Sequence, residues 1–451
     1  MKKKYLTPQI ITQITNGRYI GEKQAYDTPI RGAVRDNRDV RPGNLFICIK
    51  GARVDGHSFA NSAYDAGAVC CLAETELVDA KGPYVLVSST LEAIRIISEY
   101  YRNLFNIPVI GITGSVGKTT VKELISSVLS VKYDVLKTCG NLNNEIGVPL
   151  TLLSIDETHE VAVIEMGIND FGEMSNLAQM VRPDIFVMTK IGYAHIDTLG
   201  DLNGVLKAKT EVFKFMKTDG TAVLNGDDEL LWEYDPGIKK ITYGLKERND
   251  YRIINVKSDG FKSISFNVLD KENKTYPVTV PAYGSHIIEL VGAATAVGNL
   301  LDLTDEEIAR GFSEYKSTEG RANIIKTEKI TIIDDCYNAN PNSVKAAIQS
   351  LSELPGRRVA ILGDMLDMGE SSDALHREIG AVAAEKNIDC LICCGDCALF
   401  IYEGFKNNNA HYFKSKEDLI PNLPELIKKD DAVLVKASNG MKFNEIVDKL
   451  K

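Results

Sequence analysis

Short apolar runs, rich in β-branched residues, alternate along the chain with stretches of helical periodicity. The runs that predict buried strands are 45–49, 68–72, 84–87, 109–112, 161–164, 185–189, 221–224, 330–333, 358–362, 389–394 and 432–435. Helices are predicted at 91–104 and 121–131 from their helical periodicity, and at 287–301, where small residues indicate a close-packing face. Because strands that alternate with helices form parallel sheets, the pattern predicts an α/β protein.

The pattern divides into three units, which we place at 1–106, 107–319 and 320–451; the length of 451 residues also suggests about three domains. The first is a small α/β unit with polar loops at its strand ends. The second is a parallel sheet, to which residues 241–280 add alternating strands that predict an antiparallel edge. The third is Rossmann-like but lacks a G-x-G-x-x-G fingerprint, so no dinucleotide site is predicted there.

The strand at 109–112 runs into a glycine loop and then into a helix. The loop is Thr113-Gly114-Ser115-Val116-Gly117-Lys118-Thr119-Thr120. This arrangement wraps backbone N–H groups around phosphates, which favours nucleotide binding over an ordinary strand-to-helix turn. Lys118 is expected to reach the outer phosphates, and the Thr119 hydroxyl to help hold a magnesium ion.

Three more side chains of the second unit are candidates for chemistry. Glu165 follows the strand at 161–164, where an acid in the phosphate-loop sheet is placed to ligate magnesium; the alternative is a solvated loop glutamate. His195 follows the strand at 185–189, a suggestive position for a histidine. From composition alone, we expect Lys209 to be a solvent-exposed lysine on the surface of a helix.

A very polar turn follows the strand at 330–333 in the third unit. It reads Asp334-Asp335-Cys336-Tyr337-Asn338-Ala339-Asn340-Pro341. Two acids, a tyrosine and two asparagines at a strand end are suited to hold a polar ligand. Helix capping is the alternative for Asn340 or Asn342, but it does not account for the two acids.

Composition narrows the classes of protein. Apolar residues make up 44% and charged residues 25% of the chain, as in ordinary globular proteins. A net charge of −10 argues against non-specific nucleic-acid binding. No apolar run is long enough for a membrane span, and the basic start is followed by no long apolar core, so no signal peptide is predicted. We therefore expect a cytoplasmic protein.

The nine cysteines are odd in number and irregularly spaced, which favours reduced thiols over a disulfide framework. Cys390, Cys393, Cys394 and Cys397 have a spacing similar to that of a metal site. However, the first three lie in a predicted strand, which would point Cys390 and Cys393 to opposite faces of the sheet. Core cysteines are therefore preferred over a metal or cluster site.

Motifs in all three units resemble those of the Mur ligases. Those that carry the resemblance are Ile112–Thr120, Gly140–Pro149, Glu165–Gly167, Ala194–Ile196, Ala208–Lys209, Leu224–Asp228, Gly320–Arg321, Tyr337–Pro341 and Leu362–Met365. The Tyr-Asn-Ala-Asn-Pro run is typical of the member that adds D-alanyl-D-alanine, and is the most specific of them. The family's loop is Thr-Gly-x-x-Gly-Lys-Thr, which accounts for Ile112 where a strict phosphate loop has glycine.

The resemblance implies a three-domain Mur ligase architecture, with a central P-loop ATPase-like domain. It implies an ATP-dependent amide ligase, monomeric, that joins UDP-N-acetylmuramoyl-tripeptide to D-alanyl-D-alanine in peptidoglycan precursor synthesis. It implies one Mg²⁺ near Thr119 and Glu165, and a second near His195 and a carbamylated Lys209, with Lys207 as the fallback. The implied substrate-binding residues are Asp36, Asn37 and Arg38 for the UDP part, Asn141, Asn143, and for the dipeptide Tyr337, Asn338 and Asn340; Arg321 and Asp335 would face the nucleotide.

The chain departs from the family's patterns at several places. Asn37 replaces the serine of an Asp-Ser-Arg motif, and Ala437 and Asn439 interrupt what is usually Lys-Gly-Ser-Arg. Ile287 and Leu290 fall where asparagines help to hold adenine. An apolar side chain makes no hydrogen bond to a base, so either Asn225 takes over base recognition or the enzyme tolerates other nucleotides; we favour Asn225.

Two groups of alternatives remain open. A sister Mur ligase or a folylpolyglutamate synthetase would share everything except the Tyr337–Pro341 signature. A P-loop regulatory ATPase would hydrolyse ATP without forming an amide, but it leaves the two flanking units with their polar loops unexplained. The residues do not indicate whether the acceptor peptide ends in diaminopimelate or lysine.

Overall fold

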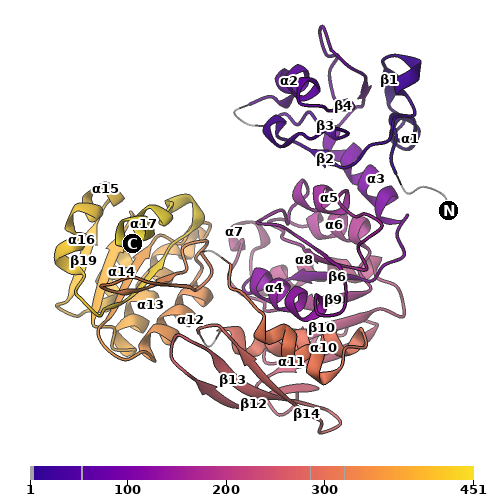
Figure 1. The fold of residues 1–451 in the computed structure, drawn as a ribbon. Coiled ribbons are helices and arrows are strands. Elements are labelled where there is room, and N and C mark those ends of the chain that lie inside the picture. The colour runs from indigo at the N-terminus through magenta and orange to yellow at the C-terminus, as the bar shows by residue number, and fades with distance from the viewer. Residues whose placement is uncertain (1–4, 52–53, 285, 319) are drawn as a thin grey trace.

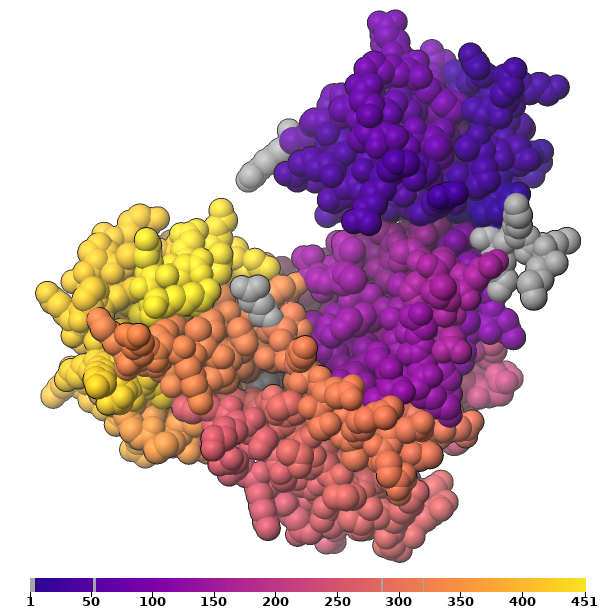
Figure 2. All heavy atoms as spheres, viewed as in Figure 1, coloured from indigo at the N-terminus to yellow at the C-terminus, as the bar shows by residue number. Residues whose placement is uncertain are grey.

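The computed structural model describes residues 5–51, 54–284, 286–318 and 320–451. Ser285, the amino-terminal Met-Lys-Lys-Lys run, and Glu319 at the predicted boundary between the second and third units lie outside the described residues. Figure 1 shows three α/β bodies, each built on its own sheet, which confirms the predicted fold class. In Figure 2 the first and third bodies both rest on the second, with open space between them.

The first body has a five-stranded sheet of order β1-β5-β4-β3-β2. Its strands are β1 Arg18–Ile20, β2 Ala33–Val34, β3 Leu45–Ile47, β4 Cys70–Ala73 and β5 Tyr84–Leu86; its helices are α1 Pro8–Thr15, α2 Ala60–Asp65 and α3 Thr90–Arg102. All neighbouring pairs are parallel except β1 with β5. Helix α3 reaches the second body, where the Tyr101 hydroxyl donates to the Ile155 carbonyl at 2.8 Å.

The second body has a nine-stranded sheet of order β14-β13-β12-β11-β10-β9-β6-β8-β7. Its strands are β6 Val109–Thr113, β7 Val135–Lys137, β8 Val161–Glu165, β9 Ile185–Met188, β10 Thr221–Asn225, β11 Lys239–Gly244, β12 Tyr251–Ser258, β13 Ile264–Asp270 and β14 Thr275–Val280. The predicted antiparallel edge is confirmed for β12 to β14. Its predicted start at 241 is wrong, because β11 pairs in parallel with both β10 and β12.

Helices cover both faces of this central sheet. They are α4 Lys118–Leu129, α5 Gly147–Leu152, α6 Glu173–Val181, α7 Ile196–Leu199, α8 Leu202–Thr210, α9 Glu229–Glu233, α10 His286–Leu300 and α11 Asp305–Ser313. β6 is completely buried, as its β-branched run predicts for a central parallel strand. Its carboxyl end, where the chain turns into α4, therefore lies in the middle of the sheet edge, between the ends of β8 and β9.

The third body has a six-stranded sheet of order β15-β16-β20-β17-β18-β19, parallel except for β15. Its strands are β15 Asn323–Lys326, β16 Thr331–Asp334, β17 Arg358–Gly363, β18 Cys390–Cys394, β19 Ala410–Phe413 and β20 Ala432–Lys436. Its helices are α12 Pro341–Ser352, α13 Ser372–Glu385, α14 Ala398–Phe405, α15 Lys416–Leu419, α16 Leu423–Leu426 and α17 Asn444–Leu450.

The cysteines of β18 are core residues, as predicted. Cys393 packs in the hydrophobic cluster on one face of the sheet, whereas Cys390 and Cys394 pack in the cluster on the other. Cys397 lies within 4.8 Å of metal-ligating atoms of Asp364 and His376. Both nitrogens of His376 are already engaged, because Nε2 accepts from the Met365 N–H at 2.9 Å and Nδ1 donates to the Ser372 carbonyl at 2.7 Å. These hydrogen bonds indicate that the cluster of Asp364, His376 and Cys397 stabilises a turn of the backbone.

Among the described residues, no helix has both the length and the apolar content that a membrane crossing requires.

Candidate active site

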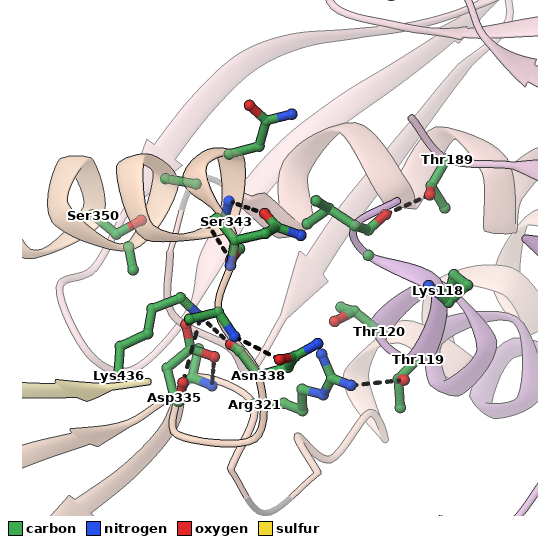
Figure 3. A pocket seen from close by; sticks show the side chains of 18 of the residues that line it. Lys118, Thr119, Thr120, Thr189, Arg321, Asp335, Asn338, Ser343, Ser350 and Lys436 are labelled. Atoms are coloured by element: carbon green, nitrogen blue, oxygen red, sulfur yellow. Dashed lines mark hydrogen bonds and ion pairs between the residues drawn. The ribbon is translucent and has the colours of Figure 1, made fainter. Parts of the chain in front are cut away.

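A cavity of about 200 Å³ lies between the phosphate loop of the second body and the third body (Figure 3). The loop and the start of α4 form one wall, together with the first turn of α10. The polar turn after β16 and the start of α12 form the facing wall. The lining residues from the prediction are Ser115, Val116, Gly117, Lys118, Thr119, Thr120, Arg321, Asp335, Asn338 and Asn340.

The glycines of the loop are required by its geometry. Gly114 has φ +148°, and a Cβ at this position would lie 1.9 Å from the Thr189 hydroxyl oxygen. That hydroxyl instead donates to the Val116 carbonyl and holds the loop against the end of β9. Gly117, with φ +84°, precedes the first residue of α4 in the left-handed region that favours glycine. The loop is therefore a pre-formed turn at a helix N-terminus, an arrangement that suits phosphate.

Two further loop residues are tied down on either side. The Thr113 hydroxyl donates to the Met166 carbonyl at 2.7 Å. The Ser115 hydroxyl donates to the Gly192 carbonyl at 3.0 Å and accepts from the Gly192 N–H at 2.9 Å. These contacts fix the loop to the residues that follow β8 and β9, so the strand ends and the loop form one rigid surface.

Lys118 lies over the loop. Its Nζ donates to the Gly114 carbonyl at 2.7 Å. Burial lowers the pKa of the Lys118 amine, as does the charge of Arg321, while Glu165 opposes this effect. A lysine amine held over a glycine loop at a helix N-terminus is suited to attract the charge of a phosphate.

Thr119 and Glu165 are brought together as the sequence predicted. The Thr119 hydroxyl donates to one carboxylate oxygen of Glu165 at 3.0 Å, and the Asn143 amide donates to the other at 2.8 Å. Glu165 is only 1% exposed. Hard oxygen donors beside a phosphate loop fit Mg²⁺, so this pair is a suitable magnesium site.

Lys209 is buried, not solvated as its composition alone suggested. It is 2% exposed, and no described residue offers its amine a hydrogen bond or an ion pair. Burial lowers its pKa well below the usual value, and the nearby Lys118 charge adds to this effect. Lys207, the fallback, is exposed and lies 5.8 Å from the Phe171 ring centroid. Lys209 is thus the lysine with an unusual environment.

His195 belongs to the same electrostatic neighbourhood. Burial lowers its pKa, as do the charges of Lys209 and Lys118, while Asp367 and Asp197 oppose the shift. An imidazole and an amine both ligate a metal through nitrogen, whereas Mg²⁺ prefers oxygen. His195 and an unmodified Lys209 therefore do not fit a second magnesium; a carbamate on Lys209 would supply the missing oxygens.

Arg321 reaches across from the third body. Its Nη2 donates to the Thr119 hydroxyl oxygen at 3.4 Å, and its guanidinium carbon lies 3.9 Å from the Tyr337 ring centroid. The Tyr337 ring thus stacks beneath the guanidinium and orients it. Arg321 and Tyr337 act as one unit that faces the phosphate loop.

The rest of the polar turn is held by Lys436 at the end of β20. Lys436 Nζ donates to the Asp335 carboxylate at 2.6 Å and to the Asn338 carbonyl at 3.0 Å. Asn340 is the N-cap of α12 and forms a reciprocal capping box with Ser343. The capping interpretation is therefore correct for Asn340, whose side-chain oxygen is occupied by the Ser343 N–H.

The predicted UDP-site residues Asp36, Asn37 and Arg38 lie in a short 3₁₀ turn of the first body, after β2. Asp36 caps a short 3₁₀ turn and accepts from the Arg38 guanidinium at 2.9 Å, an interaction that lowers the Asp36 pKa to about 2. The Asn37 amide donates to the Ser62 hydroxyl at 3.0 Å, so its replacement of serine keeps a polar contact. Asn141 lies exposed in the loop before α5, two residues from Asn143.

The predicted base-recognition residue, Asn225, is placed at the end of β10 but is already engaged. Its amide donates to a Glu289 carboxylate oxygen at 3.2 Å, and its side-chain oxygen accepts from the Asp227 N–H at 2.9 Å. Ile287 and Leu290 are both core residues; Leu290 also lines the cavity, where a Cβ on Gly117 would lie 3.2 Å from its Cδ1. Sequence reasoning missed Glu289; an acid in the first turn of a helix is too common to be a signal by itself.

Together these features define a class: a nucleotide-dependent enzyme with three α/β domains, whose phosphate loop faces a polar, Arg- and Lys-bearing wall of another domain. Three domain families match the chain. They are the "Mur ligase family, catalytic domain" at residues 30–102, the "Mur ligase middle domain" at 112–298, and the "Mur ligase, glutamate ligase domain" at 320–439. The chain belongs to the Mur ligase family.

Individual relatives are similar over nearly the whole chain. A UDP-N-acetylmuramoyl-tripeptide–D-alanyl-D-alanine ligase of Bacillus subtilis is 38% identical over 441 residues, which are 96% of this chain and 95% of the relative. The crystal structure of MurF from Acinetobacter baumannii superposes with a TM-score of 0.91 at 29% identity, covering 99% and 98% of the two chains. MurF ligase from Thermotoga maritima, solved in complex with ADP, superposes at 0.83 with 28% identity over 93% and 96%.

Proposed function

We propose that this protein is an ATP-dependent ligase that joins D-alanyl-D-alanine to UDP-N-acetylmuramoyl-tripeptide. The observation that carries the proposal is the cavity in which the phosphate loop faces the Tyr337–Pro341 turn. The relatives named for this activity span nearly the full chain, and one relative was solved with ADP.

An amide bond requires activation of the acid. A carboxylate oxygen of the tripeptide attacks the γ-phosphorus of ATP, and the bond to the β-phosphate oxygen breaks to release ADP and leave an acyl phosphate. The dipeptide amine then attacks the acyl carbon, the amide forms, and phosphate and a proton leave. Because the first step spreads negative charge over the transferring group, positioning and electrostatics provide most of the catalysis.

The second body supplies that environment. The backbone of the loop and the Lys118 amine would hold the outer phosphates, and Arg321 would approach them from the third body. Thr119 and Glu165 would hold Mg²⁺, which when bound supplies positive charge to the phosphates. Asp36, Asn37 and Arg38 would bind the UDP part. The second body would hold the nucleotide and the third body the dipeptide. We therefore expect the third body to close onto the second during turnover.

Tyr337, Asn338 and Asn340 are proposed to line the dipeptide site. Asn338 and Asn340 line the cavity, and Tyr337 lies behind Arg321. Asn141 and Asn143 are proposed to act near the acceptor; Asn143 also orients Glu165. Asp335, fixed by Lys436, faces the nucleotide from the third body.

Lys209 is proposed to be carbamylated. A neutral amine adds to carbon dioxide to give a carbamate and release one proton, which converts a nitrogen donor into a carboxylate. The buried, unpaired amine supports this modification, because burial lowers its pKa and so favours the neutral, nucleophilic form. The carbamate and His195 together would complete a second magnesium site.

Phosphate release from ATP tests the function. We expect release only when UDP-N-acetylmuramoyl-tripeptide and D-alanyl-D-alanine are both present, with one amide product formed per phosphate. A sister ligase would use a single amino acid instead of the dipeptide. Release that is independent of both substrates would support a regulatory ATPase and refute the ligase proposal.

A further inference from the structure

The first turn of α10 brings an acid with spare hydrogen-bonding capacity into the cavity. Two acids line the cavity among the described residues, Glu289 and Asp335. The Asp335 carboxylate pairs with the Lys436 amine at 2.6 Å. Glu289 is half-buried and has no ion pair with any described residue; it accepts the Asn225 amide at 3.2 Å. A carboxylate offers about four acceptor positions, so Glu289 retains several.

The position of Glu289 along the edge of the central sheet is suited to contact the base of a bound nucleotide. β6 ends in the phosphate loop, β9 lies beside β6, and β10 lies beside β9. With strands ~4.8 Å apart, the end of β10, where Asn225 meets Glu289, lies roughly 10 Å from the phosphate strand. A nucleoside that extends from the loop along this edge would bring its base to Glu289.

Apolar side chains from two bodies also line the cavity. Leu290 follows Glu289 on α10 and lies close to the phosphate loop, since a Cβ on Gly117 would come within 3.2 Å of its Cδ1. Ala346 and Ala347 of α12 line the same cavity from the third body. Small and branched apolar side chains from two bodies provide surfaces for the faces of a planar ring. Glu289 then stands where it meets the edge of that ring.

We propose that Glu289, oriented by Asn225, recognises the exocyclic amino group of the purine base. The inference rests on the proposed ATP-dependent function. In this arrangement Asn225 is a positioning residue, because its amide and carbonyl are used by Glu289 and Asp227. The adenine amine donates one hydrogen bond to the carboxylate. Since a carboxylate accepts but never donates, it also suits the adjacent N–H groups of guanine, so discrimination against GTP is weak.

The test compares ATP with purine riboside triphosphate, which lacks only the amine, in substrate-dependent phosphate release. Hydrogen bonds to charged groups predict that wild-type kcat/KM favours ATP by about tenfold to a hundredfold. Glu289→Leu is expected to bring this ratio close to one, through a higher KM for ATP with kcat little changed. Asn225→Ala is expected to give an intermediate ratio.

Two further variants sharpen the test. Glu289→Gln keeps an acceptor for the amine and adds a donor for adenine N1, so it is expected to retain the ATP preference and to raise the ratio of ATP to GTP activity. Glu306→Leu removes the same charge from an exposed position on neighbouring α11 and is expected to leave every ratio unchanged. Thermal unfolding of each variant identifies any that fail to fold.

Calorimetry separates this proposal from the ligase proposal. The affinities of ADP and purine riboside diphosphate for the full-length protein should differ by a similar ratio in the wild type, and should be equal in Glu289→Leu. This holds even if phosphate release proves independent of both substrates, which would refute only the ligase function. A wild-type ratio near one, or a ratio that Glu289→Leu leaves unchanged, would overturn the role of Glu289.

Discussion

Removal of the Lys209 amine should abolish most of the activity and leave the fold intact. Lys209→Ala deletes a buried side chain that has no hydrogen bond or ion pair to any described residue, so no polar partner is left unsatisfied. The amine carries a desolvation cost when protonated, as its lowered pKa shows. The variant should therefore retain the wild-type far-ultraviolet circular dichroism.

The expected loss of activity follows from the role of the carbamate. Mutation of residues that only support metal ligands typically costs about 10–100-fold in affinity or activity. Loss of a direct ligand should therefore lower kcat more than about 100-fold. Lys207→Ala is the matched control, because Lys207 lies two residues away on the same helix but is exposed. It should keep nearly full activity.

Two measurements connect the loss to the modification. Formate, acetate or propionate should partly restore the activity of Lys209→Ala, because each brings a carboxylate into the space that the lysine leaves. Carbon-13 NMR of the wild type in labelled bicarbonate should show a carbamate signal that is missing from Lys209→Ala and present in Lys207→Ala. An active Lys209→Ala, or a carbamate signal lost from Lys207→Ala instead, would refute the assignment.

Four further predictions concern single positions. Lys118→Ala should lower kcat by about 10²–10³ with the circular dichroism unchanged, because a charge aimed at the transferring group is lost; near wild-type turnover would refute the loop's role. Gly114→Ala should destabilise the protein by about 1–3 kcal/mol in denaturant titrations, because the left-handed backbone and the Thr189 hydroxyl both oppose a Cβ, whereas Gly140→Ala has open space and should cost less. Because the His195 pKa is lowered in the folded state, the unfolded chain binds the proton first, so stability should fall as pH drops through about 6.5; His195→Asn should remove that part of the pH dependence of unfolding. Asn340→Ser should keep the α12 cap and the thermal midpoint but raise KM for D-alanyl-D-alanine; an unchanged KM would make Asn340 a cap alone.

The strands that could be predicted are those whose burial leaves a continuous apolar run. β6, β8 and β18 are completely buried, and their sequences show it. The strands that sequence reasoning missed include β1 and β15, edge strands that keep polar residues and lack full burial. Their pairing depends on a neighbouring strand rather than on their own pattern, so the sequence gives no local signal for them.

The distinction between a local sequence signal and dependence on neighbouring elements also holds in the candidate active site. The phosphate loop could be predicted, because glycine, lysine and threonine are required locally by one turn. Lys209 could not be placed from local pattern, because a lysine one residue after Ala208 is compatible with either face of a helix. Only the packing of α8, where Val205 and Ala208 are also buried, shows that Lys209 points inward and Lys207 outward. Glu289 was missed for a similar reason, since its significance arises from β10, far away in sequence.

Spare hydrogen-bonding capacity distinguishes residues that position the site from residues that are free to bind a ligand. Asn225, Asn340 and Asp335 all match motif positions, yet each already serves a partner: a carboxylate, a helix N-terminus and a lysine. Buried polar groups are costly when unpaired, so the fold assigns most of them to such internal bonds. Lys209 and Glu289 differ from these three residues, because Lys209 has no partner among the described residues and Glu289 has several acceptor positions left. Both experiments above test whether a ligand, for Glu289, or a modification, for Lys209, supplies the partner that the fold does not.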